Sequence, residues 1–250
     1  MRVGRIWVVT GGTRGIGRAV VDRALGEGDT VHVLARTVDP GDWPVAVRDR
    51  VVGVPVDVAD AGSVERAVAA VEEVSGAVDV VVQAAGVHRG GRIDRLGDEA
   101  WDEVLTTNLT GAFRVARATR RLLSDGGCVV NIGAVVGLRG YPGDAAYGSA
   151  KAGLSGLTST LAIELAPYGV RVNLVVPGFV DTDMTAGIPE GSRRTVVDGI
   201  PMGRPGRPEE IADVVWMVAG ASYMTGSTVA VDGGLLASFG APRTRRSGRD

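Results

Sequence analysis

Seven short apolar runs, most of them rich in valine, recur along this chain of 250 residues and limit what it can fold into. Apolar residues follow one another within these runs instead of alternating with polar ones, which is typical of parallel strands buried on both faces of a sheet. Stretches with helical patterning lie between the runs, and the two kinds of segment alternate to the end of the chain. The runs cover residues 5–10, 30–35, 51–58, 78–86, 127–134, 170–178 and 227–234, and the helical stretches cover 15–27, 62–75, 98–124, 145–167 and 207–219. The pattern predicts a doubly wound α/β fold of about seven parallel strands with helices on both faces.

No linker-like segment interrupts this alternation, so we predict a single domain over residues 1–240. Residues 183–206 lack a strand and are rich in glycine, proline and arginine. They follow the carboxyl end of a strand, where open α/β sheets bind ligands, so we expect a substrate lid, with an ordinary surface connection as the alternative. Residues 241–250 are basic and are expected to form a flexible, solvated tail.

The bulk composition excludes several classes of protein. A net charge of −2 gives no reason to expect nucleic acid as a partner, and no window approaches the 18 apolar residues that a membrane span needs. The one cysteine, Cys128, cannot form an internal disulfide, and the amino-terminal segment lacks the pattern of a signal peptide. These features favour a cytoplasmic protein.

A glycine-rich turn, TGGTRGIG at residues 10–17, follows the first apolar run and leads into a helical stretch. Glycines allow a backbone to approach a pyrophosphate closely, and a helix N-terminus offers amides and a positive dipole. Arg36 ends the second run, at a place where an acidic residue would bind the ribose hydroxyls of NAD, and Arg14 adds a second cation from the turn. Two guanidiniums suit a 2′-phosphate, so the sequence favours NADPH; two solvated surface arginines are the alternative.

The segment DAAYGSAKAG, residues 144–153, contains the only lysine of the chain, Lys151, beside 26 arginines elsewhere. In a helix, Tyr147 and Lys151 at positions i and i+4 share one face. An adjacent ammonium favours phenolate and is therefore expected to lower the pKa of a tyrosine that must transfer a proton. A lone lysine at this spacing predicts a proton-transferring pair.

The order of several motifs resembles the short-chain dehydrogenase/reductase family. These are TGGTRGIG, Asp57-Val58, QAAG at 83–86, Asn108 in TTNLTGAF, NIGAVVG, YGSAK and VNLVVPGFVDTDM, spread from residue 3 to about residue 236. Within the family the chain most resembles bacterial 3-oxoacyl-[acyl-carrier-protein] reductases and polyketide ketoreductases. The resemblance implies a Rossmann-like fold, NADPH or NADP as cofactor, a homotetramer, and hydride transfer to the β-keto group of an acyl thioester.

The resemblance also assigns roles by motif. Tyr147 is implied as the general acid that protonates the developing alkoxide, Lys151 as the residue that orients the nicotinamide ribose, and Asn108 as part of a proton relay. The residues implied to bind the cofactor are Gly11, Thr13, Arg14, Gly15, Ile16, Gly17, Arg36, Asp57, Val58, Ala84, Ala85, Gly86, Tyr147, Lys151, Pro177, Gly178, Val180 and Thr182. No metal is implied.

Two positions depart from the family pattern. Gln83 stands where the motif of the nucleotide floor begins with asparagine, and we expect its extra methylene to shift a structural hydrogen bond. Ala134 stands where a serine hydroxyl holds the substrate carbonyl oxygen, and an alanine has no donor. Losing such a donor typically costs about 10²- to 10³-fold in rate. Three explanations stay open: an engineered replacement, an enzyme that positions its substrate by other contacts, or a pseudo-enzyme that only binds the nucleotide.

The leading function is therefore an NADPH-dependent ketoreductase acting on a β-ketoacyl or polyketide thioester, either as a small molecule or bound to an acyl carrier protein. Arg117, Arg120 and Arg121 are candidates for docking an acidic carrier protein, with a solvated helix face as the alternative. The competing functions are reduction of a free ketone, such as a sugar, steroid or aromatic polyketide, and nucleotide binding by a partner subunit.

Overall fold

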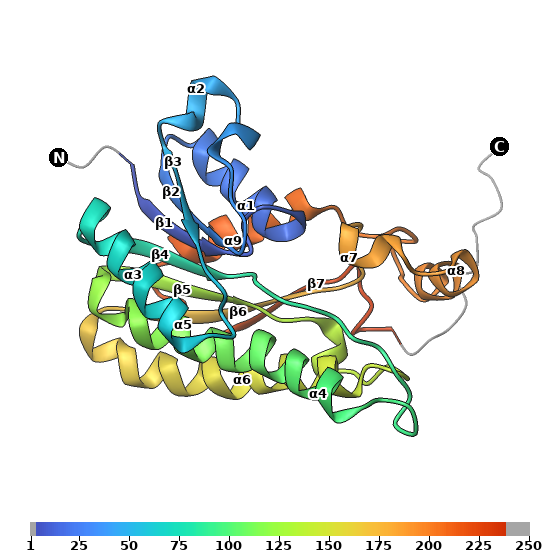
Figure 1. The fold of residues 1–250 in the computed structure, drawn as a ribbon. Helices are drawn as coiled ribbons and strands as arrows, with labels where there is room; N and C mark the ends of the chain where they lie inside the picture. Colours follow the sequence, from blue (N-terminus) through green and yellow to red (C-terminus); the bar gives the residue numbers. More distant parts are fainter. Residues whose placement is uncertain (1–3, 239–250) are drawn as a thin grey trace, which may run out of the picture.

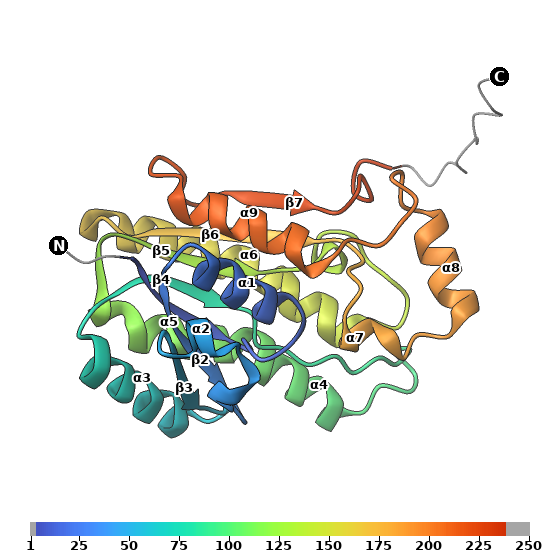
Figure 2. The same cartoon turned by 90° about the horizontal axis from the view of Figure 1, so that it is seen from above.

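A computed structural model describes residues 4–238 and contains one sheet of seven parallel strands covered by helices on both faces (Figures 1 and 2). The strand order is β3-β2-β1-β4-β5-β6-β7, so the chain winds outward from β1 in one direction and then from β4 in the other. The strands are β1 Ile6–Thr10, β2 Thr30–Ala35, β3 Val51–Pro55, β4 Val78–Gln83, β5 Leu123–Ile132, β6 Arg171–Pro177 and β7 Thr228–Val231. The predicted doubly wound fold with about seven strands is confirmed.

The helices are α1 Gly15–Gly26, α2 Val45–Arg48, α3 Ala61–Ser75, α4 Asp98–Leu105, α5 Gly111–Thr119, α6 Ala145–Leu165, α7 Asp183–Ala186, α8 Glu190–Asp198 and α9 Pro208–Gly220. A π-helical turn, Thr106–Thr110, joins α4 to α5, so the single helix expected over 98–124 is divided. Residues 183–206 contain no strand, as expected, but they form α7 and α8, which extend outward beyond the sheet at the right of Figure 1. The role of this segment as a lid stays a prediction, and the tail predicted at 241–250 lies outside the described residues.

Alternate residues of each central strand enter two separate cores. Trp7 and Val9 of β1 pack in the layer that contains α1 and α9, whereas Val8 packs in the layer that contains α3, α5 and α6. These three side chains have no exposed surface. Burial on both faces explains why the strands read as largely continuous apolar runs, because an unpaired polar side chain is costly on either face.

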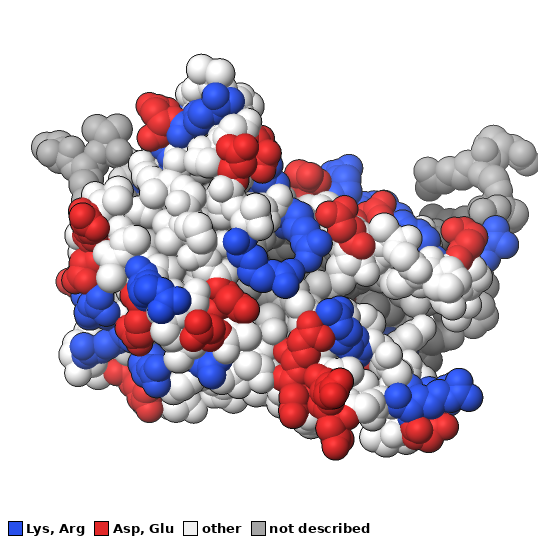
Figure 3. Space-filling view, viewed as in Figure 1, with Lys and Arg blue, Asp and Glu red and all other residues white. Residues whose placement is uncertain are grey.

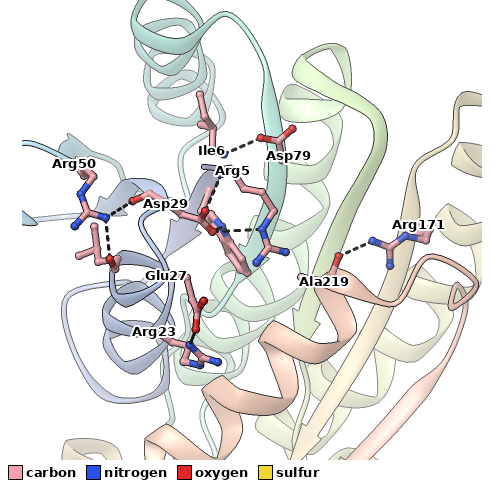
Figure 4. Close-up of polar contacts among 11 residues, drawn as sticks. Arg5, Ile6, Arg23, Glu27, Asp29, Arg50, Asp79, Arg171 and Ala219 are labelled. Atoms are coloured by element: carbon pink, nitrogen blue, oxygen red, sulfur yellow. Dashed lines mark hydrogen bonds and ion pairs between the residues drawn. The ribbon is translucent and has the colours of Figure 1, made fainter. Parts of the chain in front are cut away.

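At the amino ends of the strands, polar side chains bind one another and nearby backbone groups (Figure 4). The Asp29 carboxylate, almost fully buried, accepts hydrogen bonds from the Arg5 backbone amide at 2.8 Å and from the Trp7 indole at 2.6 Å. Asp79 accepts from the Ile6 amide at 2.8 Å, and the Arg171 guanidinium donates to the Ala219 carbonyl at 2.7 Å. Because these groups are used for structure, the opposite edge of the sheet is the place where side chains are available for function.

One buried titratable group on β2 makes the fold sensitive to acid. His32 has no exposed surface, its Nε2 lies 2.7 Å from the Ser75 hydroxyl, and its Nδ1 has no hydrogen-bond partner within residues 4–238. Burial lowers the pKa of His32 from 6.5 to about 4, because the interior disfavours the imidazolium. The unfolded chain therefore binds a proton that the folded chain does not, over the pH range between these two values.

We expect this difference to remove up to about 3 kcal/mol from the free energy of unfolding as the pH falls from neutral to about 4. A His32→Leu variant should lack this part of the loss, so its stability relative to the parent should rise progressively with acid. Urea unfolding of both proteins at several pH values measures the difference. A stability difference that is constant with pH would contradict this account.

Candidate active site

The glycine turn links the carboxyl end of β1 to the start of α1 and is held in a shape that only glycine allows. Gly11 and Gly15 have positive φ angles of 68° and 54°. A Cβ on Gly11 would lie 2.8 Å from the Ala85 backbone, and one on Gly17 would lie 2.3 Å from the Gly11 carbonyl oxygen. The predicted residues Thr13 and Ile16 lie half-buried in the same segment. The absence of side chains thus lets α1 begin directly against the end of β1.

The N-terminus of α1 is open to an anionic ligand. Its first turn contains no acidic residue, and its N-cap residue Arg14 makes no capping hydrogen bond through its side chain. Arg14 and Arg36 are exposed, and neither forms an ion pair or hydrogen bond with another residue in the part of the chain that the structure describes. In Figure 3, basic side chains surround a hollow near the centre of the face, over the region where α1 begins in Figure 1. The amides and two unpaired guanidiniums suit a phosphorylated ligand.

The predicted adenine contacts lie after a strand that is shorter than expected. β3 ends at Pro55, so Asp57 and Val58 belong to the following turn and not to the strand. Asp57 is exposed, and one of its carboxylate oxygens accepts a hydrogen bond from the Ala59 amide at 2.9 Å. Val58 is buried and packs against Gly111 of α5. The early end of β3 agrees with the proline at its last position, because proline cannot donate to a strand ladder.

The floor of the predicted nucleotide site follows β4 directly. β4 ends at Gln83, so Ala84, Ala85 and Gly86 form an extended connection that is half-buried. The Ala85 amide donates to the Thr10 hydroxyl at 3.2 Å, which fastens this connection to the end of β1. Gln83 is 5% exposed, and neither polar atom of its amide has a hydrogen-bond partner among the described residues. The asparagine-to-glutamine departure thus leaves a buried amide unpaired.

Tyr147 and Lys151 lie on one face of α6, as predicted, with the ammonium nitrogen 5.5 Å from the centre of the phenol ring. Lys151 is 6% exposed and donates to the Ile132 carbonyl, the last residue of β5, at 2.8 Å. Burial lowers the pKa of Lys151 to about 8. The lysine is therefore held at the end of the sheet instead of extending into solvent.

The expected effect of Lys151 on Tyr147 is not found in the protein alone. The pKa of Tyr147 is raised to about 12, chiefly because burial disfavours the phenolate and also because the Asp144 carboxylate is close. Our prediction of a lowered pKa was therefore wrong in direction, since the desolvation of this site outweighs the nearby ammonium. The neutral phenol is correspondingly well maintained, as a proton donor requires.

Asn108 occupies the centre of the π-helical turn between α4 and α5 and is 2% exposed. Its side-chain oxygen accepts from the Val87 amide and its amide nitrogen donates to the Val87 carbonyl, both at 2.8 Å. A Cβ on Gly86 would lie 2.8 Å from the same side-chain oxygen and 3.9 Å from Lys151 Nζ. The side chain of Asn108 thus holds the chain after β4 against the lysine.

The segments after β5 and β6 complete the site. Ala134 is extended, half-buried, and followed by a single turn of 3₁₀ helix, Val135–Gly137, that packs on α6 next to Lys151. Pro177 is the last residue of β6, Gly178 follows it against Asp232, and Val180 is buried. Thr182 is the N-cap residue of α7, and its methyl group lies 3.4 Å from where a Gly15 Cβ would be. The start of the expected lid therefore lies next to the glycine turn.

The structure adds two polar residues that our sequence analysis missed. His88 Nε2 lies 2.8 Å from Asp144 Oδ1, and the His88 ring meets the Tyr147 ring edge to face with centroids 5.1 Å apart. A signal was present, since His88 is one of only two histidines and stands two residues after the QAAG motif. Its approach to Asp144, which is 56 residues away, depends on the fold.

The three arginines considered for carrier-protein docking lie far from this site, near the amino end of β5. Arg121 Nη2 lies 2.6 Å from Glu72, and Arg117 Nη2 lies 3.9 Å from Glu65. Two of the three guanidiniums therefore form ion pairs with partly exposed carboxylates of α3. This arrangement favours a solvated helix face over a free basic patch.

A profile of the family described as enoyl-(acyl carrier protein) reductase matches residues 11–236. Two relatives, each a 3-oxoacyl-[acyl-carrier-protein] reductase FabG, are similar along nearly their whole length. The Vibrio harveyi protein is 37% identical over 238 residues, covering 93% of this chain and 97% of the relative, and the Thermotoga maritima protein is 36% identical over 244 residues, covering 93% and 98%. The chain belongs to the short-chain dehydrogenase/reductase family.

Solved structures agree with this assignment. A short-chain dehydrogenase/reductase from Serratia marcescens superposes with a TM-score of 0.87 at 33% identity and covers 93% of this chain and 98% of its own. The crystal structure of gox2181 gives the same TM-score at 34% identity, with 94% and 97% covered. The family identifies the chain as an oxidoreductase acting on a CH–OH or C=O group. Among the described residues no helix is long and apolar enough to span a membrane, and no cluster of side chains suits a metal ion.

The close contact between Gly17 and the Gly11 carbonyl allows the role of the glycine turn in cofactor binding to be tested. In a Gly17→Ala variant the new methyl would collide with the Gly11 carbonyl, so α1 must move and its amides lose their position. We expect NADPH binding to weaken by at least about tenfold. Titration of NADPH fluorescence measures it. The matched control is Gly26→Ala in the same helix, where no atom lies within 4 Å of a new Cβ and binding should be unchanged. Equal affinities for both variants would contradict the model of the site.

Proposed function

We propose that this protein is an NADPH-dependent ketoreductase that converts a β-ketoacyl thioester into the β-hydroxy form. The main support is the pair of Tyr147 and the buried Lys151 on α6, in a chain whose relatives are 3-oxoacyl-[acyl-carrier-protein] reductases. Lys151 lies near Gly86 and the end of β5, and Tyr147 lies one turn earlier on the same face of α6, so a carbonyl held there would meet the phenol. The homotetramer implied by the resemblance and the cytoplasmic location favoured by the composition remain predictions.

The residues of the site fit a nicotinamide dinucleotide. The glycine turn packs tightly against the connection after β4, and the start of α1 that follows it has no side-chain cap, so its amides would be available to a pyrophosphate. Arg14 and Arg36 would hold a 2′-phosphate, and Asp57 retains a carboxylate oxygen for the adenine. When bound, the reduced cofactor supplies a hydride to the carbonyl carbon.

In the proposed mechanism Tyr147 donates its phenolic proton to the carbonyl oxygen as negative charge develops there. Lys151 would bind ribose hydroxyls with the N–H groups that its contact with Ile132 leaves free, and its charge would stabilise the phenolate formed after proton transfer. Both polar atoms of the Asn108 side chain bind Val87. A proton relay through Asn108 would therefore use its backbone carbonyl, while its side chain positions the floor of the site.

The preference for NADPH depends on Arg36. We expect Arg36→Asp to reduce kcat/KM for NADPH by about 10²-fold, because a charge-assisted contact with phosphate is lost and a repulsive charge is introduced. NADH, which lacks the phosphate, should lose far less. Steady-state kinetics with both cofactors measure the ratio. Arg120→Asp, at the other end of the sheet, is the control and should leave the ratio unchanged. A parent enzyme that already prefers NADH would contradict the proposal.

The role of Tyr147 is tested by Tyr147→Phe, which keeps the ring and removes the hydroxyl. We expect kcat for NADPH oxidation with acetoacetyl-CoA to fall by about 10²- to 10⁴-fold, with NADPH affinity nearly unchanged. The same assays with the acetoacetyl-carrier protein and with a free ketone of similar size separate the substrate classes. Turnover of the free ketone alone would overturn the thioester assignment. Binding of NADPH without any turnover by the parent would favour a nucleotide-binding protein.

A further inference from the structure

The turn between β3 and α3 carries two polar groups that complement the edge of an adenine ring. One carboxylate oxygen of Asp57 accepts from the Ala59 amide at 2.9 Å, and the other accepts from no residue that the structure describes. The Val58 amide likewise donates to none of residues 4–238. Adenine offers a donating amino group beside an accepting ring nitrogen, so it can bind both groups only if the turn keeps one shape.

The hydrogen bonds within this turn fix only its two ends. The Asp57 amide donates to the Ser63 hydroxyl at 3.0 Å, and the Asp60 amide donates to the Asp57 carbonyl at 3.1 Å. Neither bond involves the carbonyl groups of Val58 and Ala59, which lie in the middle of the turn. Among the described residues, these two carbonyls receive no donor from the turn itself or from α3. Their partner must therefore come from elsewhere in the fold.

That partner is Arg114 of α5, 55 residues further along the chain (Figure 1). Its Nη1 donates to the Ala59 carbonyl at 2.5 Å and lies 3.5 Å from the Val58 carbonyl oxygen. Gly111 of the same helix packs directly on the turn, because a Cβ there would lie 2.9 Å from the Val58 side chain and 3.2 Å from its carbonyl oxygen. Helix α5 thus holds the turn through one side chain and through one position that must lack a side chain.

Arg114 differs in this respect from the other arginine near the turn. Arg114 is half-buried, and within residues 4–238 no carboxylate lies within 4 Å of its guanidinium. Arg66 of α3 is exposed, and its Nη2 lies 3.8 Å from the exposed Asp60 carboxylate. Hydrogen bonds from a charged donor are stronger than neutral ones. A charged donor placed on backbone carbonyls, and not on an acid, is suited to fix the shape of the turn.

We propose that Arg114 is a positioning residue for the adenosine half of the cofactor. By binding the carbonyls of Val58 and Ala59, it holds the Asp57 carboxylate and the Val58 amide in the arrangement that accepts an adenine. The inference rests on the dinucleotide site of the function proposed above. Arg114 acts through the turn and not on the reacting atoms, so the chemical step at Tyr147 does not depend on it.

Binding of adenosine 2′,5′-bisphosphate, measured by calorimetry, tests this role without any turnover. Arg114→Met keeps an apolar stem but removes the guanidinium, and we expect Kd to rise about tenfold because the charged bond to the turn is lost. Arg114→Lys retains a charged donor for one carbonyl and should bind within about threefold of the parent. Arg66→Met is the matched control, because it removes the same charge beside the same turn, and its Kd should equal that of the parent.

Steady-state kinetics separate this role from a general loss of structure. With acetoacetyl-CoA as substrate, KM for NADPH should rise about tenfold in Arg114→Met while kcat stays unchanged, because only binding of the distant adenosine is weakened. Reduced nicotinamide mononucleotide lacks the adenosine and should give the same kcat/KM with the variant and the parent. If the methionine variant does not fold, Arg114→Gln, which is shorter and uncharged, takes its place with the same expected losses.

The inference is overturned if a folded Arg114→Met variant binds the bisphosphate as tightly as the parent. It is also overturned if Arg66→Met loses as much affinity, since the effect would then be one of net charge, or if the mononucleotide reaction falls as far as the NADPH reaction. A parent that shows the expected dependence on Arg114 but reduces no acetoacetyl-CoA contradicts the thioester assignment and leaves the inference standing. A parent that binds no adenosine bisphosphate contradicts the nucleotide site and the inference together.

Discussion

The burial of a parallel sheet on both faces is the constraint on which the rest of this structure depends. Parallel strands can be joined only by crossover connections, so every strand ends at the same edge and every connection passes through a helix layer. Trp7 and Val9 pack in one core and Val8 in the other, so the faces of the sheet are covered mainly by apolar side chains. Chemistry is confined to the edges, and the contacts of Asp29, Asp79 and Arg171 occupy the amino edge.

The carboxyl edge concentrates segments that are far apart in the chain. The glycine turn after β1, the connection after β4, the extended residues after β5 and the start of α7 all meet there, and α6 supplies Tyr147 and Lys151 from one face. Many of these contacts are backbone to side chain, such as Lys151 to the Ile132 carbonyl and Asn108 to Val87. The site is thus positioned by the ends of the strands themselves, which the sheet holds rigidly.

Enclosure has an electrostatic consequence for the two central residues. Burial lowers the pKa of Lys151 to about 8 and raises that of Tyr147 to about 12, so it shifts each group toward its neutral form. A neutral phenol is ready to give a proton, but the phenolate that follows needs positive charge nearby. The ammonium of Lys151, 5.5 Å from the centre of the phenol ring, is the positive charge that the site supplies.

The sequence allowed a large part of the fold to be predicted, because continuous apolar runs identify doubly buried strands. The ends of elements were less well predicted. β3 stops at Pro55, three residues before the end of its apolar run, and the stretch 98–124 is divided by a π-helical turn that places Asn108 against Val87. The short helices α2, α7 and α8 were not expected, because they are too short or too polar to show an apolar period.

The sequence by itself determined the strand-and-helix alternation, the glycine turn and the i, i+4 spacing of Tyr147 and Lys151, since each of these is a local pattern of residue types. Only the tertiary structure decided the pairing of His88 with Asp144, the unpaired amide of Gln83 and the raised pKa of Tyr147. These depend on contacts between distant segments and on how completely water is excluded. Local sequence carries neither kind of information, because burial and long-range contact arise only when the whole sheet is assembled.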